Sequence, residues 1–135
     1  MSDAGATSYL FTGDRDWTDS YIVSLLLRGL WHQNREQGAG LVVVHGAGRG
    51  LDNQVDREAD YLNLDIRGYP ADWKQYGTKA GPIRNRLMLN DANPRIVFAF
   101  HDAIATSKGT ADMVRLALAA DKPTYLIKHA SRSDL

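Results

Sequence analysis

The sequence contains no cysteine. This absence excludes disulfide bonds, metal sites built on thiolates and cysteine nucleophiles, and it fits a reducing compartment. The chain also lacks an apolar run near the ~20 residues that a membrane helix needs. Residues 1–11 (MSDAGATSYLF) lack the basic and apolar segments of a signal peptide. We therefore expect a cytoplasmic protein without a membrane partner.

The chain also has no net charge, because 16 Lys and Arg residues balance 16 Asp and Glu residues. A protein that recruits nucleic acid through its overall field carries a basic excess. Nucleic acid is therefore not an expected partner, and any anion must be bound by a local site. Otherwise the composition is ordinary: 44% of the residues are hydrophobic and 24% are charged, which predicts a folded chain rather than a disordered one.

Strand-like apolar runs alternate along the chain with segments of helical periodicity. The strand-like runs are residues 9–12 (YLFT), 41–44 (LVVV), 95–100 (RIVFAF) and 124–127 (TYLI), with a weaker one just before Pro70. This alternation predicts an α/β fold: a Rossmann-like three-layer sandwich with a mainly parallel sheet of about five strands and helices on both faces. We expect a single domain over residues 1–135, with its core at about 8–127 and a loose tail at 128–135.

The third predicted helix carries an arginine of interest. Proline favours the first helical turn, so Pro82 indicates where this helix begins. Arg84 would then lie in that first turn, where a positive charge opposes the helix macrodipole. Unless it is simply solvated, it should bind a negative group such as a phosphate, with Asn85 beside it and Arg86 on the surface. The apolar face of this helix is predicted to comprise Ile83, Leu87, Met88 and Leu89.

A glycine-rich loop follows the second predicted strand and comprises Gly46, Ala47, Gly48, Arg49 and Gly50. Glycines in this place permit positive φ and let the backbone approach a ligand, while the next helix offers unpaired N–H groups to an anion. The loop lacks the full dinucleotide fingerprint, so we do not expect an NAD site. A tight strand-to-helix turn without a ligand is the alternative.

A second loop, Ser107-Lys108-Gly109-Thr110, follows the fourth predicted strand. Because the carboxyl ends of parallel strands share one edge of a sheet, both loops should face the same crevice. Helix capping by Ser107 or Thr110 is the alternative, and it is compatible with phosphate contact. Asp112 would lie in the first turn of the last helix. There its carboxylate either complements the helix macrodipole or points into the crevice. In the crevice it could accept hydrogen bonds from a ribose, or act as general base or electrostatic stabiliser in glycosidic cleavage.

The segment after the first strand should rim the same crevice with Asp14, Arg15 and Asp16. Trp17 would either stack on a base or pack against the first helix. Histidines at 32, 45, 101 and 129 lack zinc spacing, so neither a metal nor another cofactor is expected. The candidate catalytic residues are Arg84 and Asp112. The candidate ligand-binding residues are Gly13, Asp14, Arg15, Gly46, Ala47, Gly48, Arg49, Gly50, Asp52, Arg84, Asn85, Ser107, Lys108, Gly109 and Thr110.

Together, four segments resemble the YspA-like (cpYpsA-related) branch of the SLOG superfamily: TGDRDWTD, VVVHGAGRGLDNQVDREA, DWKQYGTKAGPIRNRLML and FAFHDAIATSKGTADMVRLA. The resemblance covers about residues 8–127, and its most specific part is AGPIRNRLML followed by the glycine-threonine turn. It implies a Rossmann-like domain that binds or processes a nucleotide derivative. The superfamily includes the Lonely Guy phosphoribohydrolases and the DNA-processing protein DprA.

The similarity to the Lonely Guy enzymes rests on Arg84 and on the turn that leads to Asp112. Those enzymes release a base from a nucleoside monophosphate, which implies an N-glycoside hydrolase as the second hypothesis. Ser107 and Lys108 replace the paired glycines of their P-G-G-x-G-T-x-E turn, and Asp112 replaces the glutamate. The shorter side chain would displace a carboxylate by roughly 1 Å or more, so binding is the leading hypothesis. The resemblance also implies a homodimer or higher homo-oligomer.

Overall fold

The computed structural model describes residues 5–129, so residues 130–135 of the predicted tail lie outside its described part. In that part, five strands form one sheet in the order β3-β2-β1-β4-β5, and every neighbouring pair is parallel. The strands are β1 (Thr7–Gly13), β2 (Leu41–His45), β3 (Asp65–Gly68), β4 (Ile96–Phe100) and β5 (Thr124–Ile127). The parallel sheet expected from the sequence is confirmed.

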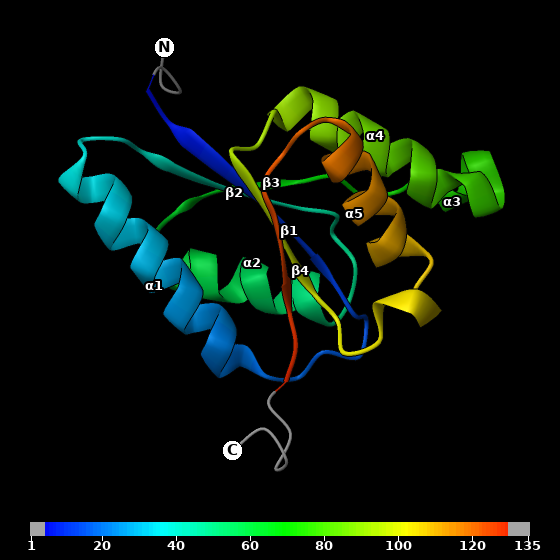
Figure 1. The fold of residues 1–135 in the computed structure, drawn as a ribbon, viewed down its shortest axis with the longest axis horizontal. Helices are drawn as coiled ribbons and strands as arrows, with labels where there is room; N and C mark the ends of the chain where they lie inside the picture. The colour runs from blue at the N-terminus through cyan, green and yellow to red at the C-terminus, as the bar shows by residue number, and fades with distance from the viewer. Residues whose placement is uncertain (1–4, 130–135) are drawn as a thin grey trace.

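Helices cover both faces of this sheet, as Figure 1 shows. On one face α1 (Ser20–Glu36) packs against α2 (Leu51–Tyr61), and on the other α4 (Ala80–Ala92) packs against α5 (Gly109–Ala119). The short α3 (Trp73–Tyr76) lies beside α4, and the 3-10 turns η1 (Gly77–Lys79) and η2 (Ile104–Thr106) precede α4 and α5. The predicted Rossmann-like three-layer sandwich is therefore confirmed.

Alternation of side chains along the strands divides the core into two layers. Tyr9 and Phe11 of β1 belong to the cluster under α1 and α2, whereas Leu10 belongs to the cluster under α4 and α5. Every residue of β2 is buried, as expected for an inner strand of a parallel sheet. Packing on both faces fixes the carboxyl edge of the sheet, from which the loops of the candidate site emerge.

The direction of chain winding changes between β1 and β4. From β1 the chain passes through α1 to β2, whereas β4 is reached through α4 on the opposite face. At such a switch point the loops after neighbouring strands diverge and leave a crevice. The two strands stay close until they end, because a Cβ on Gly13 would lie 2.6 Å from the carbonyl oxygen of Phe100. Glycine is thus required where the crevice begins.

The third predicted helix differs from expectation in its start. It begins at Ala80 rather than at Pro82, and it is preceded by α3 and η1, which were not predicted. Arg84 is therefore in the second turn of α4, and the argument that it opposes the macrodipole at the first turn was wrong. The predicted apolar face is only half buried: Met88 and Leu89 are in the core, but Ile83 is 41% exposed and Leu87 is 57% exposed.

The first helix, α1, has a side-chain cap. Asp19 is its N-cap, and the carboxylate of this residue accepts hydrogen bonds from the N–H groups of Tyr21 and Ile22. Among residues 5–129, no helix combines the length and the apolar character that a membrane span requires.

Candidate functional site

A cleft of about 780 Å³ opens at the carboxyl edge of the sheet, where β1, β2 and β4 end. We call it the carboxyl-end cleft. Its walls come from the loops after these strands and from α3, α4 and α5. Of the residues predicted from the sequence, it brings together Gly13, Asp14, Arg15, Gly46, Ala47, Gly48, Arg49, Asp52, Arg84, Asn85, Ser107, Lys108, Gly109, Thr110 and Asp112. The cleft thus unites both predicted glycine loops with Arg84.

Gly50 is the one predicted residue that does not line the cleft. It has φ +68°, and a Cβ on it would lie 2.2 Å from the carbonyl oxygen of Arg15. Glycine is therefore required here by backbone packing against the loop after β1. Gly46 is crowded by side chains instead, because its Cβ would lie 2.6 Å from Arg84 Nη1 and 3.2 Å from Asp52 Oδ2. The glycine loop makes room for the side chains of Arg84 and Asp52.

The Arg84 guanidinium reaches from α4 to the loop after β2. Its Nη1 donates hydrogen bonds to the carbonyl oxygens of Gly46 and Tyr69, and its Nε donates to Asn85 Oδ1 at 2.9 Å. Its Nη2 has no acceptor among the described residues. Burial lowers the pKa of the Arg84 guanidinium, while the nearby Asp52 carboxylate opposes that shift. The result is a partly buried cation, fixed in place, with donor capacity left over.

Asp52 is the acidic counterpart in this wall. It lies in the first turn of α2, and its Oδ2 accepts a hydrogen bond from the Gly48 N–H at 3.0 Å. Its Oδ1 is enclosed and has no partner among the described residues. Burial raises the pKa of the Asp52 carboxyl, against the Gly48 N–H and the Arg84 charge, which lower it. A carboxyl in this setting has an unused acceptor close to the cation.

A chain of polar contacts joins α4 to α5 across the floor of the cleft. Asn85 is buried, and its Nδ2 donates to Asp112 Oδ2 at 3.0 Å and to the Gly109 carbonyl oxygen at 3.3 Å. Asp112 Oδ1 accepts from Arg115 Nη2 at 2.6 Å. Through the contact between Arg84 and Asn85, the two predicted catalytic side chains are linked by a single amide. Asp112 is thus oriented by its neighbours.

The second loop is organised by capping. Ser107 Oγ accepts a hydrogen bond from the Thr110 N–H at 3.0 Å, which is the helix-capping alternative that the sequence offered. Thr110 is buried, whereas Lys108 and Gly109 are exposed. The capped turn therefore presents Lys108 and bare backbone to the cleft.

The tryptophan after β1 does not face the cleft. Trp17 is 2% exposed, and its ring packs edge-on against Phe100 and stacks on His129 with ring centroids 3.8 Å apart. Its indole N–H donates to the Asp19 carbonyl oxygen at 2.9 Å. Of the two roles offered by the sequence, packing is the one observed. Asp16 does line the cleft.

Several cleft residues were not selected from the sequence. They are Thr12, Pro70, Ala71, Trp73, Thr78, Gly81, Pro82 and His101. Half of them belong to the segment between β3 and α4, which has no clear hydrophobic period. One signal was available there: Asp72 precedes Trp73 and caps α3 by accepting from the Gln75 N–H at 3.1 Å. An aspartate cap would have indicated a helix and placed Trp73 at its start.

Two histidines end strands at this edge with the same local geometry. His45 Nδ1 and His101 Nδ1 each accept a hydrogen bond from the backbone N–H two residues on, at 2.9 and 3.0 Å. The ring proton therefore belongs on Nε2, which in His45 faces Asp56 Oδ2 at 2.6 Å. In His101 it faces Asp14 Oδ2 at 4.0 Å. Residues 5–129 contain no group of three or more His, Asp or Glu side chains that could hold a metal ion.

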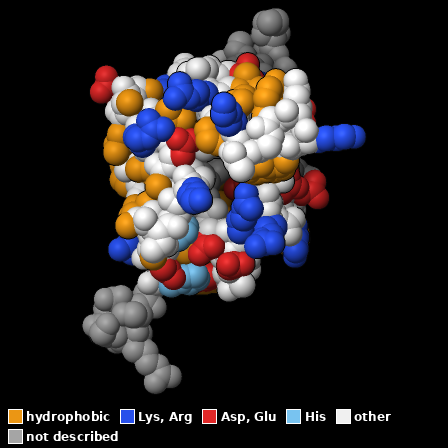
Figure 2. Space-filling model, turned by 90° about the vertical axis from the view of Figure 1, so that its right-hand side faces the viewer, with side chains coloured by type: hydrophobic (Ala, Val, Ile, Leu, Met, Phe, Trp, Pro, Cys, Tyr) orange, Lys and Arg blue, Asp and Glu red, His pale blue; other side chains and the backbone are white. Residues whose placement is uncertain are grey.

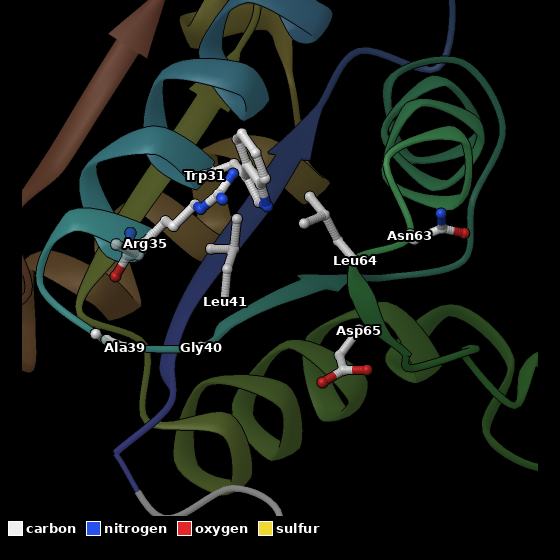
Figure 3. A pocket seen from close by; sticks show the side chains of 10 residues that line it. Trp31, Arg35, Ala39, Gly40, Leu41, Asn63, Leu64 and Asp65 are labelled. Carbon is white, nitrogen blue, oxygen red and sulfur yellow. The ribbon is translucent and has the colours of Figure 1, made fainter.

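A second hollow, of about 440 Å³, lies at the opposite edge of the sheet, where β2 and β3 begin (Figure 3). We call it the amino-end hollow. Trp31 and Arg35 of α1 form its rim, with the Arg35 guanidinium carbon 5.0 Å from the centre of the Trp31 ring. The other lining residues are Asn34, Gly38, Ala39, Gly40, Leu41, Asn63, Leu64 and Asp65.

Comparisons with known proteins give one sequence relative and one structural neighbour of note. No family model matches the chain. The fold is similar to that of DNA processing protein A (DprA) from Streptococcus pneumoniae, with a TM-score of 0.70 and 15% identity. That match covers 96% of this chain and 53% of the other, so the chain spans about half the length of DprA, and the likeness is one of fold.

The sequence relative is the gene 61 protein of Mycobacterium phage D29. The two are 36% identical over 119 residues, which cover 84% of this chain and 90% of the phage protein. Identity at this level across most of both chains shows that the protein belongs to the family of the phage gene 61 protein.

Proposed function

We propose that the carboxyl-end cleft binds a nucleotide, or a small molecule derived from one, through its phosphate. The observation that carries this proposal is the setting of Arg84. Its guanidinium is partly buried in the cleft wall, and two carbonyl oxygens and one amide hold it in place. Its Nη2 is left without an acceptor among the described residues. Charge-assisted hydrogen bonds to a phosphate would satisfy those donors.

The two glycine loops support the same ligand class. Gly48 and Gly109 are exposed at the cleft, where the absence of a side chain lets a phosphate approach the backbone closely. The position of the cleft at the switch point of the sheet is where open parallel sheets bind ligands. The resemblance of AGPIRNRLML, which contains Arg84, to the YspA-like branch and the Lonely Guy enzymes points to a nucleotide.

Calorimetric titration with AMP, ADP, ADP-ribose and ribose 5-phosphate tests this proposal. Arg84→Gln should weaken binding of every phosphate compound by about 10-fold or more, because a charge-assisted contact is lost. Arg86→Gln is the matched control, since Arg86 is an exposed arginine on the same helix and does not line the cleft. If the wild-type protein binds none of these compounds, or if the two variants behave alike, the proposal is wrong.

N-glycosidic cleavage is the second candidate function. It is favoured by the contacts that orient Asp112 beside the buried Asn85, at the end of a polar chain that starts at Arg84. A fixed carboxylate suits stabilisation of an oxocarbenium-like transition state. Chromatography of nucleoside monophosphates incubated with the protein should then show free base. Cleavage must disappear in Asp112→Asn, and activity that survives this change would exclude the assignment.

Nucleic acid is a further candidate, because the structural neighbour DprA is by name a DNA processing protein. Exposed Arg15, Arg49 and Lys108 surround the cleft, although the net charge is zero. On the face shown in Figure 2, however, Lys and Arg side chains are interspersed with Asp and Glu side chains. We therefore expect weak binding of single-stranded DNA that disappears with added salt. Tight, saturable binding at physiological salt would instead favour this candidate.

Self-association stays a prediction. Ile83, Leu87 and Leu118 are exposed apolar residues on α4 and α5, and they could supply an apolar interface for the homo-oligomer that the resemblance implies. Sedimentation of the wild type and of a Leu87→Glu variant would test it, since a charge in an apolar interface should dissociate a dimer.

A further inference from the structure

Trp73 is the tryptophan that lies in the carboxyl-end cleft. It is the first residue of α3, and its side chain remains 48% exposed although it lines the cleft. The other two tryptophans lie elsewhere, because Trp17 is in the core and Trp31 rims the amino-end hollow. A large aromatic surface left open in a cleft needs a reason, since its burial would stabilise the fold.

The edge of the Trp73 ring rests against bare backbone. A Cβ on Gly81 would lie 3.2 Å from Cη2 of the indole, so glycine at this position lets the ring approach α4 closely. From the other side of the cleft, the guanidinium carbon of Arg15 lies 5.7 Å from the ring centre. Arg15 is exposed and can therefore move. The indole is thus supported at its edge, while a single mobile cation covers its face.

The Trp73 ring packs against α4 close to Arg84, the residue proposed to bind the phosphate. Gly81, which touches the indole, and Arg84 are three residues apart on α4 and therefore share one side of that helix, separated by about 4.5 Å along its axis. A nucleotide places a ribose between its phosphate and its base. Since Arg84 and Trp73 both line the cleft, a ligand of that shape could contact one with its phosphate and the other with its base.

On the basis of the proposed function, we propose that Trp73 is the base-stacking residue of the cleft, and that the ligand class is a nucleoside phosphate with a planar aromatic base. The base stacks on the indole that Gly81 supports, and the planar guanidinium of Arg15 moves onto the outer face of the base. Stacking tolerates any base, because every base has a π face. Trp73 therefore selects nucleotides over sugar phosphates.

Calorimetry with AMP and ribose 5-phosphate separates base recognition from phosphate recognition. The wild type should bind AMP more tightly. Trp73→Leu should lower the affinity for AMP by about 10-fold and leave that for ribose 5-phosphate unchanged. Trp73→Phe, which retains a flat ring, should recover most of the loss. Trp31→Leu is the matched control, and it should bind both compounds like the wild type. Thermal unfolding of each variant checks that the fold is intact.

The outcomes distinguish this inference from the proposed function. If ribose 5-phosphate binds and is lost in Arg84→Gln, but Trp73→Leu keeps the wild-type ratio of the two affinities, base stacking on Trp73 is refuted and phosphate binding stands. An equal loss of both compounds in Trp73→Leu assigns the residue a supporting role and also refutes the inference. Failure of the wild type to bind either compound overturns both proposals.

Discussion

The carboxyl-end cleft and the amino-end hollow lie at opposite edges of one sheet and are lined by similar residue types. Each has a tryptophan with an arginine over its ring: Trp73 with Arg15 in the cleft, and Trp31 with Arg35 in the hollow. They differ in the origin of these pairs. The pair in the hollow comes from one helix, whereas the pair in the cleft joins two segments that are distant in sequence.

The two sites also differ in how their polar groups are used. In the hollow, Asn34 Nδ2 donates hydrogen bonds to Tyr9 and Leu30 and so ties α1 to the sheet, although Asn34 Oδ1 has no partner among the described residues. In the cleft, Arg84 and Asp52 are held by backbone groups and still have unused donors and acceptors. A polar group whose hydrogen bonds join two elements is explained by its contribution to the stability of the fold. The unused groups of the cleft belong to charged side chains, whereas that of the hollow is a neutral amide, so the cleft is the better candidate for an ionic ligand.

The largest difference in stability is expected between alanine variants of two glycines that have similar positive φ. Gly50, in the loop beside the cleft, has φ +68° and is crowded by Arg15, while Gly38, in the hollow, has φ +71° and no atom near its missing Cβ. Gly50→Ala should lower the free energy of unfolding by about 1–3 kcal/mol more than Gly38→Ala, because overpacking adds to backbone strain. Urea unfolding of both variants measures this. Equal losses would mean that the loop relaxes freely.

A second pair of glycines should separate ligand binding from stability. Gly46→Ala places a methyl group 2.6 Å from Arg84 Nη1, so the guanidinium must move, whereas the Cβ of Gly40→Ala meets Ala6 at an ordinary 3.6 Å. We expect Gly46→Ala to weaken AMP binding by about 10-fold and Gly40→Ala to leave it unchanged. Calorimetry measures both affinities. A Gly46→Ala protein that binds AMP like the wild type would show that Arg84 is not part of the binding site.

The acidic groups of the two sites should differ in their effect on pH dependence. Burial raises the pKa of the Asp52 carboxyl in the folded protein, so folding favours its protonated form. That stabilisation is complete below the ordinary pKa of about 4 and is lost as pH rises through the folded pKa. The stability of Asp52→Asn relative to the wild type should therefore increase with pH. Denaturant unfolding from acid to neutral pH measures this difference.

The control for Asp52 is Asp65→Asn, which removes an exposed carboxyl from the amino-end hollow. Because the Asp65 carboxyl is exposed, this variant does not remove a buried charge. A difference for Asp52→Asn that stays flat or falls with pH would contradict the assignment of a buried, destabilising charge.

The smallest effect is expected for the arginine of the hollow. Arg35→Gln removes an exposed cation–π contact with Trp31, which is worth about 0.5–1 kcal/mol at most. Unfolding should become easier by no more than that amount, and AMP binding should not change. A measurable loss of AMP affinity would extend the ligand site to the opposite edge of the sheet.

The sheet was predicted well because each strand has a local signal in the sequence. Buried runs such as the one at 41–44 have few alternatives, and both glycine loops follow such runs. The carboxyl-end location of the loops then follows from the geometry of parallel strands. The position of Arg84 within α4 was not predictable in the same way, because η1 and the residues around it extend the helical region ahead of Pro82 without any hydrophobic period.

Two Asp-Trp pairs show the limit of local pattern most clearly. Asp16 precedes Trp17 and Asp72 precedes Trp73, yet one indole is buried in the core and the other is half exposed in the cleft. The difference lies in their tertiary contacts: Trp17 packs against Phe100 of β4, whereas Trp73 begins a helix in the wall of the cleft. Burial of an aromatic residue depends on neighbours that are distant in sequence.

The three hydrogen bonds of Arg84 have a thermodynamic consequence for any ligand. A free arginine side chain has about 2 kcal/mol of rotamer entropy to lose when it is ordered. In this fold the contacts to Gly46, Tyr69 and Asn85 have already removed much of that freedom. Association therefore has little side-chain ordering to oppose it, and affinity can be gained from few contacts. A small, rigid phosphate compound is the kind of partner that benefits most from such preorganisation.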